Sequence, residues 1–272
     1  MNWKNLFTPV ANLNAAEAKE FMATRKSGDY QLLDVRQPKE YEAGHLAGAK
    51  LIPVKELPDR LAELERDKPV IVYCAVGGRS RAAAQLLAGK DFANVFNLSG
   101  GIKAWEGRQV TGPEEAGLEL FVGVREYDDA VALAYAMEDG LQQFYRKLAA
   151  AADDAEHKAL YERLAGFEDK HKARLVAEYR NKHGDELVPV RELDVMEGGR
   201  HIDAFLARAK ALIGTRQDIL EFAMALETQA LDLYSRMAQK SDSAETRDFF
   251  LGLADEEKLH LSYLARELDK VL

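Results

Sequence analysis

The sequence predicts a protein of two parts: an α/β domain built on a mostly parallel sheet and, after it, an all-α four-helix bundle. Short β-rich runs alternate with helical stretches over residues 1–106, which is typical of a parallel sheet with helices on both faces. From residue 127 to the end, the pattern is helical throughout. One arrangement of glutamate and histidine also occurs twice in this second part. We therefore expect a sheet domain over 1–108, a linker over 109–126 and a helical bundle over 127–272.

Four runs in the first part are expected to be buried strands, because they are short, rich in branched residues and bounded by turn residues. These runs are Gln31–Val35, Lys50–Pro53, Val70–Cys74 and Asn94–Leu98. Helices are expected between them, over Ala15–Thr24, Glu56–Glu65 and Arg81–Ala88. Residues 107–117 then carry three glycines and one proline, which indicates a connection between domains.

The composition allows two folded domains and restricts their partners. The chain has 272 residues, 47% of them apolar, which is enough for two hydrophobic cores. Residues 1–110 hold 16 Lys and Arg against 13 Asp and Glu, whereas residues 111–272 hold 21 against 33. Of the net charge of −9, the first part therefore contributes +3 (16 − 13) and the second −12 (21 − 33), and the acidic second part argues against a nucleic-acid partner.

Cys74 is the single cysteine, so an intrachain disulfide is excluded and a reducing compartment is favoured. The start of the chain lacks the apolar run of a secretory signal. No stretch approaches the roughly twenty apolar residues that span a bilayer. We expect a cytoplasmic protein without a membrane partner.

The second part contains an internal repeat. Residues 134–171 align with residues 223–260 without a gap, with 12 identities in 38 positions. Near the middle of each repeat, Asp153 and Asp242 each begin a D-x-x-E sequence, a capping-box signal for a helix start. Each repeat therefore predicts a helical hairpin. The segment 181–214 between them, with a short helical stretch near Ile202–Leu212, is expected to be a crossover connection.

The repeat carries six candidate metal ligands. They are Glu138, Glu168 and His171, followed 89 residues later by Glu227, Glu257 and His260. The spacing returns the glutamates of each hairpin to one level, because each residue adds the same rise along a helix. Two glutamates plus a Glu-x-x-His from each of two further helices is the arrangement with which four-helix bundles hold two iron or manganese ions. Such ligands suit iron or manganese better than copper, with zinc as an alternative. Open positions on the metals would accept dioxygen or peroxide.

Tyr145 and Tyr234 stand seven residues after Glu138 and Glu227, two turns along the same helix face. We expect their hydroxyl groups to hydrogen-bond ligand carboxylates, with simple core packing as the alternative.

On these six ligands, residues 127–272 resemble the rubrerythrin branch of the ferritin-like superfamily. The resemblance implies a di-iron protein that reduces peroxide, or that oxidises or stores ferrous iron, together with an external electron donor. Two features differ. Rubrerythrins carry a further glutamate one turn after the third-helix ligand, where this chain has Ala230, and usually a rubredoxin-like site of paired cysteines, which this chain lacks. Peroxidase turnover and its electron source therefore stay open.

Cys74 ends a predicted strand and opens the loop CAVGGRS before a predicted helix. A thiol at such a turn meets the loop N–H groups and the positive end of the helix dipole, which favour the thiolate, as does the adjacent Arg79. Gly77 and Gly78 would let the loop curl, so that backbone groups of Ala75, Val76 and the two glycines face one sulfur.

The first part resembles a rhodanese domain over about residues 8–108. The matching segments are Leu33-Asp34-Val35-Arg36, Glu40-Tyr41-x-x-Gly44-His45, Gly48-Ala49, Ile52-Pro53, the Cys74 loop, and Gly100-Gly101 with Trp105. The resemblance implies that Cys74 takes a sulfur atom from thiosulfate or a small persulfide and passes it to a thiol or to cyanide. The loop N–H groups and Arg79 would stabilise the anionic sulfur. Asp34 and Arg36 are expected to hold the fold together.

A phosphatase is the rival for this loop, because the same fold supports phosphatases and arsenate reductases. Those enzymes need an arginine six residues after the cysteine. Here Arg79 comes five residues after Cys74 and Ser80 occupies the next position, so the shorter loop favours sulfur over phosphate.

The two parts together predict a sulfurtransferase fused to a di-iron bundle that reacts with peroxide, dioxygen or ferrous iron, in oxidative stress or in iron and sulfur handling. One alternative is a protein that stores or senses iron without turnover. Another is a bundle that only dimerises the sulfurtransferase domain. The apolar stretch Leu118–Val124 leads us to expect a homodimer.

Overall fold

The computed structural model describes residues 9–124, 126–184, 188, 195–196, 200–203, 205–206 and 213–272. The chain divides between Ala116 and Gly117 into two compact units, which we call the α/β unit and the helical unit. This division lies inside the segment 109–126 that the sequence indicates as a linker. Across the described residues, no helix is both long enough and apolar enough to cross a membrane.

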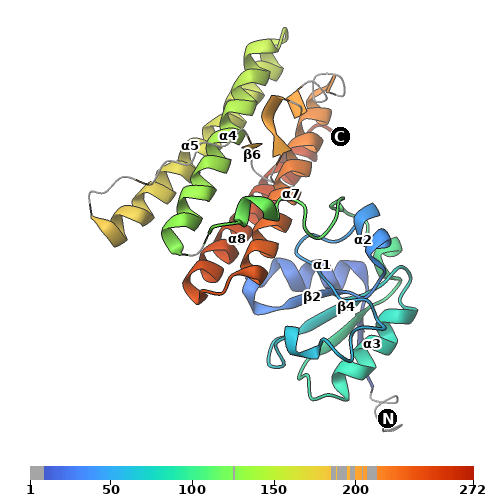
Figure 1. The fold of residues 1–272 in the computed structure, drawn as a ribbon. Coiled ribbons are helices and arrows are strands. Elements are labelled where there is room, and N and C mark those ends of the chain that lie inside the picture. Colours follow the sequence, from blue (N-terminus) through green and yellow to red (C-terminus); the bar gives the residue numbers. More distant parts are fainter. Residues whose placement is uncertain are drawn as a thin grey trace. The chain divides into compact units, whose positions relative to one another are not determined.

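The α/β unit is built on a five-stranded parallel sheet with the strand order β1-β5-β4-β2-β3 (Figure 1). Its strands are β1 (Ala11–Leu13), β2 (Gln31–Asp34), β3 (Lys50–Leu51), β4 (Val70–Tyr73) and β5 (Val95–Leu98). Its helices are α1 (Ala15–Ala23), α2 (Pro38–Ala43) and α3 (Gly78–Ala88), with 3-10 turns η2 (Ser27–Asp29), η3 (Leu61–Glu63) and η4 (Gly101–Ala104). The predicted parallel α/β sheet is thereby confirmed, and the edge strand β1 is an addition to it.

Side chains of the central strand β4 alternate between two hydrophobic cores. Val70 and Val72 pack in the cluster that contains residues of α3, whereas Ile71 and Tyr73 pack in the cluster that contains residues of α1 and α2. Since successive strand residues point to opposite faces, the sheet is covered on both sides. This explains why β4 is buried at every position.

The helix expected over Glu56–Glu65 is wrong. Residues 54–59 form turns, and only the 3-10 turn η3 follows them. The Leu57 N–H donates to the Pro53 carbonyl over 3.1 Å, as in a helix, but the next such bond would need an N–H at residue 58, which Pro58 lacks. Helix α3 also begins at Gly78, three residues before the predicted start at Arg81. The short helix α2, with Pro38 in its first turn, was not predicted.

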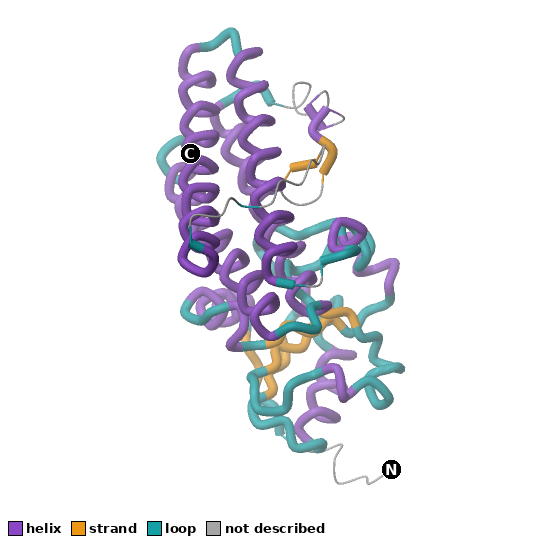
Figure 2. The backbone as a smooth tube through the Cα atoms, turned by 60° about the vertical axis from the view of Figure 1, so that its left-hand side comes forward, coloured by secondary structure: helices purple, strands orange, loops and turns teal. Residues whose placement is uncertain are grey.

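The helical unit contains four long helices: α4 (Tyr127–Ala151), α5 (Ala155–His183), α7 (Arg216–Lys240) and α8 (Ala244–Leu268). A 3-10 turn, η5 (Leu118–Phe121), precedes them. Three-residue turns join α4 to α5 and α7 to α8, so each pair forms an antiparallel hairpin, and Figure 2 shows the long helices side by side. The predicted all-α second part is confirmed at this level.

The hairpin turns lie one residue later than the sequence predicts. Asp154, not Asp153, caps α5 by accepting a hydrogen bond from the His157 N–H. Ser243, not Asp242, caps α8 in the same way. In each hairpin, the residue directly before the new helix is the N-cap, and Asp and Ser are both favoured at that position.

A small hairpin packs against α4 within the segment that joins the two helical hairpins. Its strands are β6 (Val195–Met196) and β7 (Arg200–His201), which pair antiparallel. A Cβ atom on Gly140 of α4 would lie 2.1 Å from the Val195 carbonyl oxygen, so only glycine permits this approach. This hairpin was not predicted. The helical stretch predicted near 202–212 lies largely outside the described residues.

We predict that Gly140→Ala destabilises the helical unit by about 1–3 kcal/mol, because the new methyl group meets backbone that cannot move aside. Gly166→Ala in α5 is the matched control, since nothing lies within 4 Å of its Cβ position. That control should stabilise the unit by up to about 1 kcal/mol through helix propensity. Chemical denaturation followed by circular dichroism measures both. Equal stabilisation by the two substitutions would contradict the packing described here.

Candidate functional site

Cys74 directly follows β4, at the carboxyl end of a strand flanked by β2 and β5. Backbone hydrogen bonds from η4 hold the start of the loop that follows Cys74. The Ile102 N–H donates to the Cys74 carbonyl over 2.9 Å, and the Lys103 N–H donates to the Ala75 carbonyl over 3.1 Å. A Cβ atom on Gly101 would lie 2.3 Å from the Cys74 carbonyl oxygen, so glycine is required there. The start of the loop therefore has little freedom.

The loop curls at Gly77, whose φ of 103° lies in the left-handed region that favours glycine. Gly78 is different, because it is the first residue of α3 and has open space around it. The curl directs the Gly77 N–H at the Cys74 sulfur over 3.1 Å. The Val76 side chain stands outward into solvent.

The Cys74 thiol has a pKa below its ordinary value. Burial raises this pKa, but hydrogen bonds from the Ser80 hydroxyl and from the backbone N–H groups of Ser80, Val76 and Gly77 together lower it by more. Neutral donors, aimed at the sulfur by the loop and by the start of α3, therefore stabilise the thiolate. The sequence indicated these backbone groups, but it did not indicate Ser80.

Ser80 connects the sulfur to a chain of polar side chains that runs through the buried Asn97 to the exposed Asn12. Its Oγ lies 3.4 Å from the Cys74 sulfur and 2.7 Å from Asn97 Oδ1. The Asn97 amide donates in turn to Asn12 Oδ1 over 2.8 Å. Because a hydroxyl has one proton, Ser80 can donate to the thiolate only by releasing Asn97. No spacing in the sequence connects Asn12 and Asn97 to the cysteine.

Arg79 is held by a carboxylate that the sequence analysis did not assign to the site. Its two terminal nitrogens lie 2.7 Å and 2.6 Å from the oxygens of Glu40, in a bidentate pair. Hydrogen bonding to Arg79 lowers the pKa of Glu40 to about 2. The Arg79 pKa is raised, first by the Glu40 hydrogen bond and more weakly by the charge of Cys74. Arg79 therefore interacts with both the Glu40 carboxylate and the Cys74 sulfur, and its interaction with Glu40 is the stronger one.

Asp34 and Arg36 form a second ion pair, which is buried. Arg36 Nη2 lies 2.7 Å from Asp34 Oδ2 and donates to the Gly44 carbonyl over 2.6 Å. These contacts tie the end of β2 to the end of α2.

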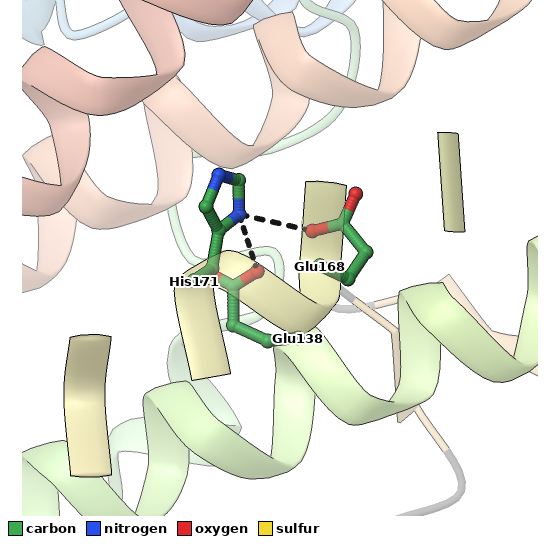
Figure 3. Close-up of side chains that lie close together, drawn as sticks. All are labelled: Glu138, Glu168 and His171. Atoms are coloured by element: carbon green, nitrogen blue, oxygen red, sulfur yellow. Dashed lines mark hydrogen bonds and ion pairs between the residues drawn. The ribbon is translucent and has the colours of Figure 1, made fainter. Parts of the chain in front are cut away.

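In the helical unit, the six predicted ligands form two triads. One consists of Glu138, Glu168 and His171, and the other of Glu227, Glu257 and His260. Within each triad, one candidate ligand atom per residue lies within 4.8 Å of the others. His171 Nδ1 is 3.1 Å from Glu138 Oε2 and 3.0 Å from Glu168 Oε2. Figure 3 marks both contacts with dashed lines. His260 Nδ1 repeats this with distances of 3.3 Å and 3.1 Å.

The two triads meet in one layer. The rings of His171 and His260 stack with their centroids 4.2 Å apart. All four glutamates are between 1% and 4% exposed. One apolar cluster includes Met137 and Ala230, and the other includes Leu141 and Leu226, so the carboxylates lie between them. The rise along each helix therefore does bring the duplicated residues level.

The layer concentrates negative charge in the protein interior. Burial and the neighbouring charges of Glu138 and Glu227 raise the pKa of Glu168 well above its usual range. Burial lowers the pKa of His171, but hydrogen bonds and charge from Glu138 and Glu168 outweigh it and raise this pKa to about 11. Burial raises the pKa of Glu138, but the hydrogen bond and charge of His171 lower it by more. Burial likewise raises the pKa of Glu227, but hydrogen bonds with Glu257 and His260 lower it by more. In the first triad, hydrogen bonding to His171 therefore offsets part of the negative charge that burial brings together.

The two candidate tyrosines lie near this layer. Tyr234 on α7 points across to the other hairpin, where its hydroxyl donates to Glu138 Oε1 over 3.4 Å. Tyr145 on α4 is fully buried, and its ring packs against Phe144.

We predict that Ser80→Ala raises the pKa of Cys74, because the thiolate loses a hydrogen bond that stabilises its charge. Such a bond to a charged group changes the thiolate fraction by about tenfold near neutral pH. The pH profile of alkylation by iodoacetamide measures this directly, since Cys74 is the single cysteine. Exposed Ser99→Ala is the control. An unchanged pH profile for Ser80→Ala would show that the Ser80 hydroxyl does not stabilise the thiolate.

Comparison with known proteins agrees with the α/β unit. The rhodanese-like domain family matches residues 17–108. YqhL of Bacillus subtilis is 46% identical over 78 residues, which cover 29% of this chain and 62% of YqhL. A thiosulfate sulfurtransferase of Pseudoalteromonas translucida is 35% identical over 78 residues, covering 29% of this chain and 74% of that enzyme.

A rhodanese-like domain protein from Staphylococcus aureus, known as a crystal structure, aligns with 38% of this chain and 98% of its own length, at 28% identity and a TM-score of 0.35. The family match covers a segment that includes the Cys74 loop. Through residues 17–108, the chain belongs to the rhodanese-like family.

Proposed function

We propose that the α/β unit transfers sulfane sulfur through a persulfide on Cys74. The observation that carries the proposal is the set of donors around the Cys74 sulfur, with the Gly77 N–H at 3.1 Å and the Ser80 hydroxyl at 3.4 Å, which lower the pKa of the thiol. A thiolate is the nucleophile that sulfur transfer needs, and the same N–H groups would stabilise a negative charge on the added sulfur. The relatives named as sulfurtransferases support this chemistry.

The transfer has two steps. The Cys74 thiolate attacks the outer sulfur of a donor, a new S–S bond forms, and the donor's old bond to that sulfur breaks with its electron pair on the leaving group. An acceptor thiolate or cyanide then attacks the outer sulfur of the persulfide, and the Cys74 thiolate leaves. No net oxidant is consumed. Arg79 would stabilise the anion, within the limits that its pair with Glu40 sets.

We predict that Cys74→Ser lowers thiosulfate:cyanide sulfurtransferase activity at least about a hundredfold, because a hydroxyl is not ionised at neutral pH. The matched control is the double variant Cys74→Ser/Ser99→Cys, which restores a thiol at an exposed position of the same unit. This control should remain inactive. Activity retained by Cys74→Ser would show that Cys74 is not the nucleophile.

For the helical unit, we propose a ferritin-like four-helix bundle that holds two iron ions, with manganese or zinc as alternatives. The supporting observation is the convergence of four buried glutamates and two imidazoles in two triads. A hard carboxylate set with one imidazole nitrogen per site fits iron or manganese. The charge of the layer also fits, because divalent cations would offset the negative charge of the four buried glutamates.

Each triad would hold one ion through its glutamates and its histidine Nδ1. Iron bound there would supply a redox centre able to react with peroxide or dioxygen. Tyr234 would orient Glu138 through their hydrogen bond, and Tyr145 stands at the corresponding position of the first repeat. The two flanking apolar clusters would exclude bulk water from the layer. Turnover would require an external electron donor.

Iron storage or sensing is the alternative use of the same site, and a bundle that only dimerises the chain is the alternative without metal. Ferrous iron and peroxide separate the first two: one round of oxidation without continued consumption of reductant indicates storage. Homodimerisation through the region of Leu118–Val124 is part of this proposal, because Val122 is an exposed apolar residue within it.

We predict that protein purified without added metal contains about two transition-metal ions per chain, measured by elemental analysis. Replacing both members of one Glu-x-x-His pair, by Glu168→Ala/His171→Ala or by Glu257→Ala/His260→Ala, should remove about one ion and lower the unfolding temperature of metal-loaded protein. Glu156→Ala/His157→Ala is the matched control, because Glu156 is exposed, His157 is half-buried and neither belongs to a triad. Less than about half an ion per wild-type chain would contradict the metal site.

A further inference from the structure

The Cys74 loop lies beside a network of four charged side chains whose formal charges cancel. Arg79 forms its bidentate pair with Glu40, and Arg36 forms its pair with Asp34. The charge of Arg36 also acts on Glu40, which links the two pairs. Two guanidinium groups therefore face two carboxylates, and the network offers an incoming ligand no net positive charge.

The rest of the loop adds no charge. Residues 75–78 read Ala-Val-Gly-Gly, and Val76 is 61% exposed. The loop N–H groups that could bind an anion are directed at the Cys74 sulfur itself, led by Gly77. Thus an apolar side chain stands next to the nucleophile, and the loop's neutral donors are already used by the thiolate.

Two classes of donor make different demands on such a site. Thiosulfate is a dianion, so its reaction brings two negative charges to a thiolate and releases sulfite, which is also a dianion. A protonated small persulfide, RS–SH, brings an uncharged sulfur: the Cys74 thiolate attacks the terminal sulfur, the S–S bond breaks, and RS⁻ leaves. Both reactions conserve charge and electrons. Only the first needs a local excess of positive charge to offset repulsion.

We infer that this site prefers a low-molecular-weight persulfide to thiosulfate, and that Glu40 sets the preference by occupying Arg79. The inference rests on the proposed sulfur transfer. Glu40 is a positioning residue: it acts through the guanidinium and does not touch the reacting sulfur. One relative is named as a thiosulfate sulfurtransferase, so thiosulfate is the appropriate competitor.

The test compares rates of persulfide formation on Cys74 in the full-length chain, with thiosulfate and with 2-hydroxyethyl persulfide as donors. Intact mass follows the gain of one sulfur atom on the single cysteine. Wild-type protein should react faster with the persulfide. Glu40→Gln should raise the ratio of thiosulfate to persulfide rates by about two- to fivefold, the range expected for one exposed charge.

Glutamine is the chosen substitution because it keeps the shape of the residue and can still accept the hydrogen bond that Glu40 Oε2 takes from the Gln37 N–H at the start of α2. Glu42→Gln is the matched control, since this exposed residue of the same helix loses the same charge. Its donor ratio should equal that of wild type. A purely structural role of Glu40 would change both rates together and leave the ratio unaltered.

A measurement on wild-type protein keeps the inference testable if Glu40→Gln fails to fold. Added salt should accelerate the thiosulfate reaction, because it screens repulsion between like charges. A thiosulfate rate that falls with salt, a wild-type preference for thiosulfate, or an unchanged ratio in Glu40→Gln would each overturn the inference. If neither donor transfers sulfur to Cys74, the proposed function itself is wrong, and the inference falls with it.

Discussion

Four carboxylates buried in one layer are the constraint on which the helical unit depends. An ionised carboxylate in a protein interior is strongly unfavourable unless a positive charge lies beside it. Here the glutamates come from four different helices, so all four helices must stay level for the two histidines to reach them. The layer also divides the hydrophobic core into two clusters, one on each side. In this unit, the charge of the buried carboxylates is therefore balanced only when the four helices pack at the right level.

The Cys74 loop stabilises its anion by a different physical means. Its hydrogen-bond donors are neutral: a serine hydroxyl and backbone N–H groups. Hydrogen bonds from η4 and the left-handed conformation of Gly77 hold these donors in place. This solution leaves the nearby Arg79 paired with Glu40. A single anion can be stabilised by dipoles alone, whereas a layer of four carboxylates requires full positive charges.

The two repeats agree at the ligands and differ around them. In the first repeat, Lys172 bridges Asp139 and Gln142 beside the triad. The corresponding positions of the second repeat hold Leu261, Thr228 and Leu231. The β6–β7 hairpin likewise packs on α4, where glycine allows its approach. Duplication thus fixes the positions of the ligands, while each site keeps its own surroundings.

The sequence by itself determined the parallel sheet, the helical second part and the level of the six candidate ligands, because hydrophobic period and spacing along a helix are local properties. It failed where Pro58 overrode a helical pattern. Only the tertiary structure decided that Arg79 pairs with Glu40, and that the Ser80 hydroxyl donates to Asn97. These contacts join segments distant along the chain, and only the packing of the sheet with its helices brings such segments together.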